Sequence, residues 1–154
     1  MKGPGAGGSG ANQCGFTLIE LMMVVVITAL LLMIALPAYQ QQLQKTRRSL
    51  ARAELMEVLA RQEQYFLNHR QYAPQLTDLG YPESPYAIDA SGNDLAATAV
   101  NRIYLIDLAT RANGFALYAT PQLAQSGDRD CATLGLTSIG LKSASGKGAT
   151  EDCW

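Results

Sequence analysis

One acidic side chain stands inside an otherwise apolar stretch near the start of this 154-residue chain. The run from Phe16 to Leu36 has Glu20 as its single charged residue. About 20 apolar residues let a helix span the hydrocarbon core of a bilayer, and a charge inside such a span costs about 2.5 kcal/mol or more. Glu20 therefore either meets a positive partner within the membrane or extends toward the lipid headgroups.

Three cysteines offer thiol chemistry. Cys14 precedes the apolar run, whereas Cys131 and Cys153 lie near the C-terminus. We predict that the last two form a disulfide with Cys14 as an odd thiol, and two unrelated buried thiols are the alternative. The segment between them is rich in Gly, Ser and Thr, so a cross-link stabilising it by about 3 kcal/mol is physically reasonable. Such a pair indicates an oxidising compartment, and the neighbouring Trp154 either packs over the bridge or contacts a partner.

Residues that could support catalysis or hold a metal are few. The single histidine, His69, lies in a polar segment, where a solvated or capping role is expected. The sequence lacks the Cys-x-x-Cys, His-Glu-x-x-His and Gly-x-Ser-x-Gly motifs. We therefore expect no enzyme, no cofactor and no metal. The alternative is a calcium site formed by acidic residues near the cysteine pair: Asp128, Asp130, Glu151 and Asp152.

The overall charge balance argues against a generally basic nucleic-acid binder. The net charge is −1, from 12 basic and 13 acidic residues. A smaller basic patch could still contact DNA phosphates, and the candidates are Arg102, Arg111, Arg129, Lys142 and Lys147. The basic cluster Lys45–Arg52 follows the apolar run directly, which favours contacts with anionic lipids or with other subunits.

A helical pattern continues beyond the apolar run. Pro37 predicts a kink, because it removes one backbone donor and its ring clashes with the preceding turn. An apolar stripe then returns at helical spacing: Leu43, Leu50, Ala51, Leu55, Val58, Leu59, Tyr65 and Phe66. We predict one long helix from Phe16 to about Asn68, with its first half in the membrane or a filament core and its second half on a globular core.

Strand patterns fill much of the remaining chain. Residues 102–108 and 115–120 predict a hairpin around the Asn113-Gly114 turn, and two shorter strands are expected at 131–137 and 140–143. Residues 82–100 are polar and predict a connecting loop. The expected fold is α+β, a long helix packed on three or four antiparallel strands, with a disulfide-bounded C-terminal region. The chain then divides into residues 1–15, a spanning segment 16–37 and a globular domain 38–154.

The stretch Gly15-Phe16-Thr17-Leu18-Ile19-Glu20 resembles the class III signal of type IV pilins and pseudopilins. The resemblance implies cleavage between Gly15 and Phe16 by a prepilin peptidase, N-methylation of Phe16, and loss of Cys14 with the leader. It also implies that Glu20 neutralises the terminal amine of a neighbouring subunit in a filament. The chain would reside in the bacterial inner membrane with its globular domain in the periplasm, and then in the extracellular pilus.

Three functions are consistent with this resemblance. The first is a PilE-type minor pilin that serves pilus assembly, twitching motility and adhesion, together with other pilin subunits and the assembly platform. The second is a ComP-like pilin that binds DNA for natural transformation. The third is a pseudopilin of a type II secretion machine, which would favour the calcium site over the disulfide.

Overall fold

The structure is a computed structural model that describes residues 16–111 and 114–154. The chain forms two units, Met1–Tyr39 and Gln40–Trp154, and the second is called the head below. The described part of the first unit is the N-terminal portion of helix α1 (Leu18–His69), whose large apolar side chains are exposed. It is long and apolar enough to cross a membrane. α1 continues through Pro37, and the kink predicted there stays a prediction.

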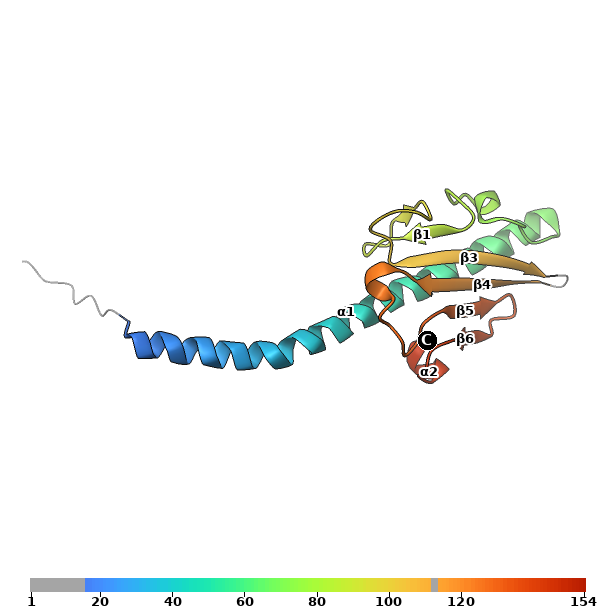
Figure 1. The fold of residues 1–154 in the computed structure, drawn as a ribbon. Coiled ribbons are helices and arrows are strands. Elements are labelled where there is room, and N and C mark those ends of the chain that lie inside the picture. The colour runs from blue at the N-terminus through green and yellow to red at the C-terminus, as the bar shows by residue number, and fades with distance from the viewer. Residues whose placement is uncertain (1–15, 112–113) are drawn as a thin grey trace, which may run out of the picture. The chain divides into compact units, whose positions relative to one another are not determined.

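The head places the C-terminal part of α1 against one antiparallel sheet (Figure 1). The strand order in the sheet is β2-β1-β3-β4-β5-β6. The strands are β1 (Tyr86–Ile88), β2 (Asp94–Leu95), β3 (Tyr104–Arg111), β4 (Gly114–Pro121), β5 (Leu134–Thr137) and β6 (Lys142–Ala144). Short 3-10 helices η1 (Leu76–Leu79) and η2 (Leu123–Gln125) and the helix α2 (Thr150–Cys153) complete the head.

The centre of the sheet is the hairpin of β3 and β4, which pairs Tyr104 with Pro121 at one end and Arg111 with Gly114 at the other. Strand alternation turns one face of this hairpin toward α1. The core between the helix and the sheet contains Ala51, Leu55, Val58, Tyr86, Ile88, Tyr104, Ile106, Phe115, Leu117, Leu134 and Leu136. The predicted stripe on α1 thus packs on the sheet, as the sequence pattern indicated.

The sheet has six strands, whereas the sequence pattern predicted three or four. The segment 82–100 was expected to be a loop, but it contains β1 and β2, and β1 lies between β2 and β3. All three residues of β1 are buried. Such a short strand gives no readable alternation, so periodicity cannot distinguish it from loop. The predicted α+β fold with its long helix, antiparallel sheet and C-terminal disulfide is otherwise confirmed.

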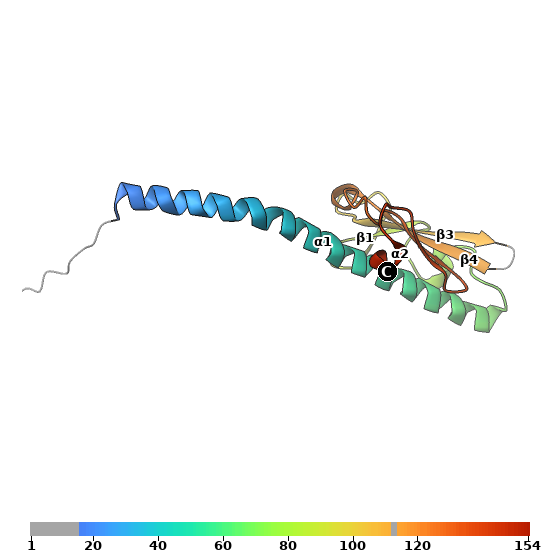
Figure 2. The same cartoon turned by 90° about the horizontal axis from the view of Figure 1, so that it is seen from below.

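The C-terminal region packs beside α1. Figure 2 shows α2 and the C-terminus next to the part of the helix that carries the sheet. Arg52 on α1 donates from Nη1 to the carbonyl oxygen of Trp154 at 2.8 Å. This contact, together with the disulfide of Cys153, holds the C-terminal end of the chain in the head beside the helix.

Candidate functional site

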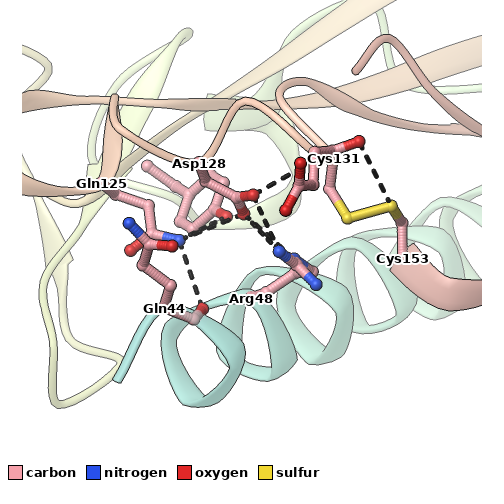
Figure 3. Close-up of polar contacts among 8 residues, drawn as sticks. Gln44, Arg48, Gln125, Asp128, Cys131 and Cys153 are labelled. Carbon is pink, nitrogen blue, oxygen red and sulfur yellow. Dashed lines mark hydrogen bonds and ion pairs between the residues drawn. A yellow bond between two sulfur atoms is a disulfide. The ribbon is translucent and has the colours of Figure 1, made fainter. Parts of the chain in front are cut away.

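A group of buried polar side chains, here called the Arg48 cluster, joins α1 to the loop before β5 (Figure 3). Arg48 donates from Nη2 to Asp128 Oδ1 at 2.7 Å and from Nε to Asp128 Oδ2 at 3.0 Å. Both side chains are almost fully buried. Gln125 donates from Nε2 to the Gln44 carbonyl and to the Tyr104 hydroxyl, each at 3.2 Å. Burial raises the pKa of Tyr104 to about 12, so this hydroxyl is neutral.

Asp128 also fixes the start of the disulfide loop. Its Oδ1 atom accepts the backbone N–H of Cys131 at 3.3 Å. Cys131 is bonded to Cys153, with their Cα atoms 5.5 Å apart and 22 positions of sequence separation. The predicted disulfide is therefore present, and the alternative of two unrelated thiols is wrong. The Arg48 cluster and the disulfide act on the same loop, one through charge and the other through a covalent bond.

A polar surface segment is here called the C-terminal strip. It consists of Arg129, just before the disulfide loop, and residues 142–148 inside that loop. Its backbone continues the β5–β6 ladder, since Ser145 N–H donates to Thr133 and Lys147 N–H donates to Arg129. The side chains of Arg129, Lys142 and Lys147 are exposed. Lys142 Nζ lies 5.3 Å from the centroid of the Trp154 ring. The fold thus gathers three of the five basic residues predicted to contact DNA.

The other two predicted basic residues lie elsewhere. Arg102 is half-buried and donates from Nη1 to the Ala99 carbonyl at 2.7 Å and from Nε to Gln122 at 3.4 Å. Its guanidinium is therefore engaged by the loop before β3 and by the residue that follows β4. Arg111 is exposed at the far end of β3, where the hairpin turns. The five residues do not form one continuous patch in this fold.

Trp154 packs against the head beside the strip, and its predicted position over the disulfide stays a prediction. The indole Nε1 donates to the Ser143 carbonyl at 2.8 Å, and the ring packs against the core cluster that includes Cys153. Because Trp154 is the single tryptophan of the chain, its fluorescence reports on this region alone.

Two expectations about charged residues need correction. Asp128 cannot serve a calcium site, because its carboxylate is paired with Arg48, and within the described ranges no three His, Cys, Asp or Glu side chains converge for a metal. The cluster Lys45–Arg52 was assigned as a whole to lipid or subunit contacts. Arg48 is buried in the head and Arg52 binds the Trp154 carbonyl, so this assignment is wrong for both residues.

A second buried polar group on α1, called the Glu54 cluster, was not predicted from the sequence. Tyr86 on β1 donates its hydroxyl to Glu54, and the Tyr86 ring stacks on Tyr81 with centroids 4.4 Å apart. Arg61 lies over the Tyr81 ring, 4.6 Å from the centroid. Burial raises the pKa of Glu54, although the hydrogen bond from Tyr86 opposes this. Burial, followed by the Glu54 carboxylate, raises the pKa of Tyr86 far above its usual value.

In the first unit, Glu20 has a local role that the sequence could have indicated. Its backbone N–H donates to the Thr17 hydroxyl at 3.3 Å, just before α1 begins at Leu18. Thr17-x-x-Glu20 is the capping-box pattern, in which the threonine caps the helix and the glutamate stands at its third position. The predicted processing residue Gly15 lies outside the described residues. Phe16 is exposed, and its cleavage and methylation stay predictions.

Two protein-family models match this chain. Residues 37–135 match the family model described as type IV minor pilin ComP, DNA uptake sequence receptor. Residues 10–36 match the model of the prokaryotic N-terminal methylation motif, which covers Gly15, Phe16 and Glu20. The first match spans more than half of the chain and contains α1 from Pro37 onward together with strands β1 to β4.

Curated relatives point to the same family. The type IV major pilin protein PilE1 of Neisseria gonorrhoeae is 38% identical over 80 residues, or 47% of this chain and 44% of the relative. A fimbrial protein of Pseudomonas aeruginosa is 32% identical over 102 residues, or 62% of this chain and 66% of the relative. The chain thus spans less than half the length of the gonococcal relative that it matches. From the methylation motif, the fold and these matches, the chain belongs to the type IV pilin family, and its head is of the ComP minor-pilin type.

Proposed function

We propose that this chain is a minor type IV pilin that binds DNA during uptake. The observation that carries the proposal is the match of residues 37–135 to a family model whose description is a DNA uptake sequence receptor. It favours the second of the three functions considered from the sequence over the first. The pseudopilin function loses its support, since Asp128 is occupied by Arg48 and the disulfide is present.

The C-terminal strip is the surface that we expect to contact the DNA backbone. Lys142 lies in β6, and Lys147 lies in the bend that follows this strand. Ser143 and Ser145 lie between them, and all four side chains are exposed. Lysine and serine side chains are common donors to phosphate oxygens, so such a segment suits contacts that position the duplex without reading its sequence.

The strip packs tightly against the loop before β5 at Gly146. A side chain at Gly146 would place its Cβ 2.2 Å from the Asp130 carbonyl oxygen, so only glycine fits there. The acidic residues Asp130, Glu151 and Asp152 are exposed in the same region and would weaken a purely electrostatic attraction. We therefore expect moderate affinity that depends strongly on salt.

Binding of the full-length chain in a nonionic detergent to a labelled duplex tests this function. Fluorescence anisotropy at several salt concentrations gives the slope of log affinity against log salt, whose magnitude is about 0.9 for every phosphate that the protein neutralises. Lys142→Ala/Lys147→Ala should weaken binding and reduce the slope by about 2. The matched control, Lys45→Ala combined with Lys147→Ala, removes the same charge but only one strip lysine, and should reduce it by about 1. Absence of DNA binding at low salt would contradict the proposal.

The pilus role rests on the N-terminal residues. We propose that the leader, residues 1–15, is removed between Gly15 and Phe16, and that residues 16–37 hold the chain in the inner membrane before it enters a pilus with other pilins. The head then lies in the periplasm and later outside the cell. The exposed apolar surface of this segment and the methylation-motif match support the proposal. A native chain that still begins at Met1 in mass spectrometry would contradict it.

Glu20 is the residue that we expect to set the register of assembly. A carboxylate among exposed apolar side chains gains most from a neighbouring subunit's terminal amine, because pairing offsets the cost of a buried charge. Glu20→Gln keeps the helix-capping N–H of this residue but removes the charge. Incorporation into sheared filaments should fall at least tenfold, while Thr17→Ser, which keeps the cap, should assemble normally. Normal assembly of Glu20→Gln would leave capping as the function of this position.

A further inference from the structure

A hollow of about 570 Å³ lies where the end of α1 meets the ends of β3 and β4. It shares no residue with the C-terminal strip. Its wall combines two aromatic rings, two guanidinium groups, an amide and a hydroxyl, from Phe66, Tyr72, Arg70, Arg111, Gln71 and Thr110. Its volume is within the range of sites that take a small ligand.

The charges in this hollow have one sign. No carboxylate belongs to its wall. Among residues 16–111 and 114–154, no ion pair or side-chain hydrogen bond engages Arg70 or Arg111, and both are exposed. The acid in contact with the wall is Glu63, which accepts the Tyr72 hydroxyl at 3.2 Å. Two uncompensated guanidinium groups in one hollow favour an anion with several oxygens, such as a phosphate.

Arg70 occupies a backbone position that ordinarily belongs to glycine. It follows the last residue of α1 with a φ of 58°, and its N–H donates to the Phe66 carbonyl at 2.8 Å. This left-handed position closes a helix, and a side chain there is strained. Strained residues gather at functional sites because surrounding structure must hold them there. The fold thus holds the Arg70 side chain in the wall of the hollow although its backbone is strained.

The aromatic part of the wall offers a platform of fixed orientation. The Phe66 and Tyr72 rings stack with centroids 4.8 Å apart, and Tyr72 meets Phe115 of the core edge-on, also at 4.8 Å. Tyr72 is thus held between the core and Phe66, whose ring is half-exposed. An aromatic side chain of this kind stacks on a nucleic-acid base, whereas a base-paired nucleotide inside a duplex has no free face to offer.

We propose that this hollow binds one unpaired nucleotide of DNA, with its phosphate between Arg70 and Arg111 and its base against Phe66. The inference rests on the proposed function, because it names the part of the DNA that a second surface of the head would take. The strip would hold the duplex backbone, and the hollow would hold a strand end or another nucleotide outside the stack.

Three labelled DNAs separate this inference from the proposed function. The first is a blunt duplex, the second carries a short single-stranded overhang, and the third carries the same overhang without bases. Each is titrated by anisotropy with the full-length chain in a nonionic detergent. We expect the overhang with bases to bind at least fivefold more tightly than the abasic overhang, as stacking of one base predicts. Because the two overhangs have equal charge, electrostatics alone cannot produce the difference.

Two variants locate the effect in the hollow. Phe66→Leu keeps the charge and an apolar side chain, and should abolish the preference for bases while leaving blunt-duplex binding within twofold. Arg70→Gly relieves the left-handed backbone, so it should melt no lower than the parent chain and still lose overhang affinity. Its unchanged melting excludes misfolding as the cause.

The results of these titrations distinguish failure of the nucleotide site from failure of the proposed function. Equal affinity for the base-bearing and abasic overhangs, with blunt-duplex binding intact, overturns the nucleotide site and leaves the proposed function standing. It would indicate a hollow that takes anions without regard to a base. A preference that persists in Phe66→Leu places the stacking surface elsewhere and also overturns the inference. Loss of binding to all three DNAs in the parent chain removes the proposed function and this site together.

Discussion

The Arg48 cluster and the Glu54 cluster both join α1 to the rest of the head, yet they place a carboxylate in different situations, buried for Asp128 and half-buried for Glu54. In the first, the carboxylate of Asp128 reaches the helix from a loop and is met by a guanidinium through two nitrogens. In the second, the carboxylate of Glu54 comes from the helix itself and is met by the neutral hydroxyl of Tyr86. Six residues of helix, about 9 Å, separate Arg48 from Glu54.

One helix therefore makes two kinds of polar contact: a charge pair that fixes the position of a loop, and a carboxylate whose protonation changes with pH. A buried charge pair with satisfied hydrogen bonds fixes a geometry, because losing either partner leaves an uncompensated charge. The half-buried carboxylate of Glu54 faces a phenol and has no opposite charge to hold it ionised, so the effect of burial dominates and its pKa rises. We expect the Arg48 cluster to determine where the disulfide loop sits, and the Glu54 cluster to make the head sensitive to pH.

The largest effect is expected from breaking the charged pair. Arg48→Met keeps the length and packing of the side chain but leaves Asp128 buried without its partner, so the free energy of unfolding should fall by about 3–5 kcal/mol. Denaturant unfolding of the full-length chain in detergent, followed through Trp154 fluorescence, measures it. The double variant that combines Arg48→Met with Asp128→Asn restores neutrality and should recover part of the stability. A decrease below about 1 kcal/mol for Arg48→Met alone would show that the pair does not hold the loop.

A somewhat smaller effect is expected from removing the covalent link in the same loop. Cys131→Ser with Cys153→Ser should lower the free energy of unfolding by about 3 kcal/mol, because the open loop gains chain entropy in the unfolded state. Reducing agent should destabilise the parent chain similarly and leave the double variant unchanged. If the variant unfolds like the oxidised parent, the Arg48 cluster alone suffices to organise the loop.

The sequence carries the local features of this molecule well. The apolar stripe on α1 predicted which side of the helix is buried, because helical spacing of Leu55 and Val58 depends on neighbouring residues only. The disulfide was predicted from two cysteines close together near the C-terminus, with Cys14 as the odd thiol. The capping pattern of Thr17 and Glu20 is equally local and can be read from four consecutive residues, although the charge of Glu20 points first to the membrane.

Features that depend on distant partners could not be read in the same way. Arg48 and Gln62 are polar residues of α1, yet both are buried, one against Asp128 and the other bonded twice to the backbone of Ala73. The residues around Arg48 in the sequence do not indicate that its partner lies 80 positions away. The hollow at Arg70 depends on a helix end meeting a hairpin end, and only the folded chain brings these together.

The smallest effect, and the one that separates the two clusters most directly, is the pH dependence of the Glu54 cluster. The ordinary pKa of a glutamate is 4.5, and burial raises that of Glu54 in the folded chain. Above pH 4.5 the unfolded chain loses this proton first, so unfolding releases a proton and the free energy of unfolding falls as pH rises through the raised pKa.

Glu54→Gln keeps an oxygen that accepts the Tyr86 hydroxyl but cannot ionise. The variant should therefore gain stability relative to the parent chain as pH rises from 4.5 through the raised pKa, as measured by thermal unfolding. Glu151→Gln, at an exposed position on α2, is the matched control and should follow the parent chain. Parallel pH profiles for the parent and Glu54→Gln would mean that the hydrogen bond from Tyr86 fully offsets the effect of burial on the pKa of Glu54, and the pH sensitivity assigned to this cluster would be wrong.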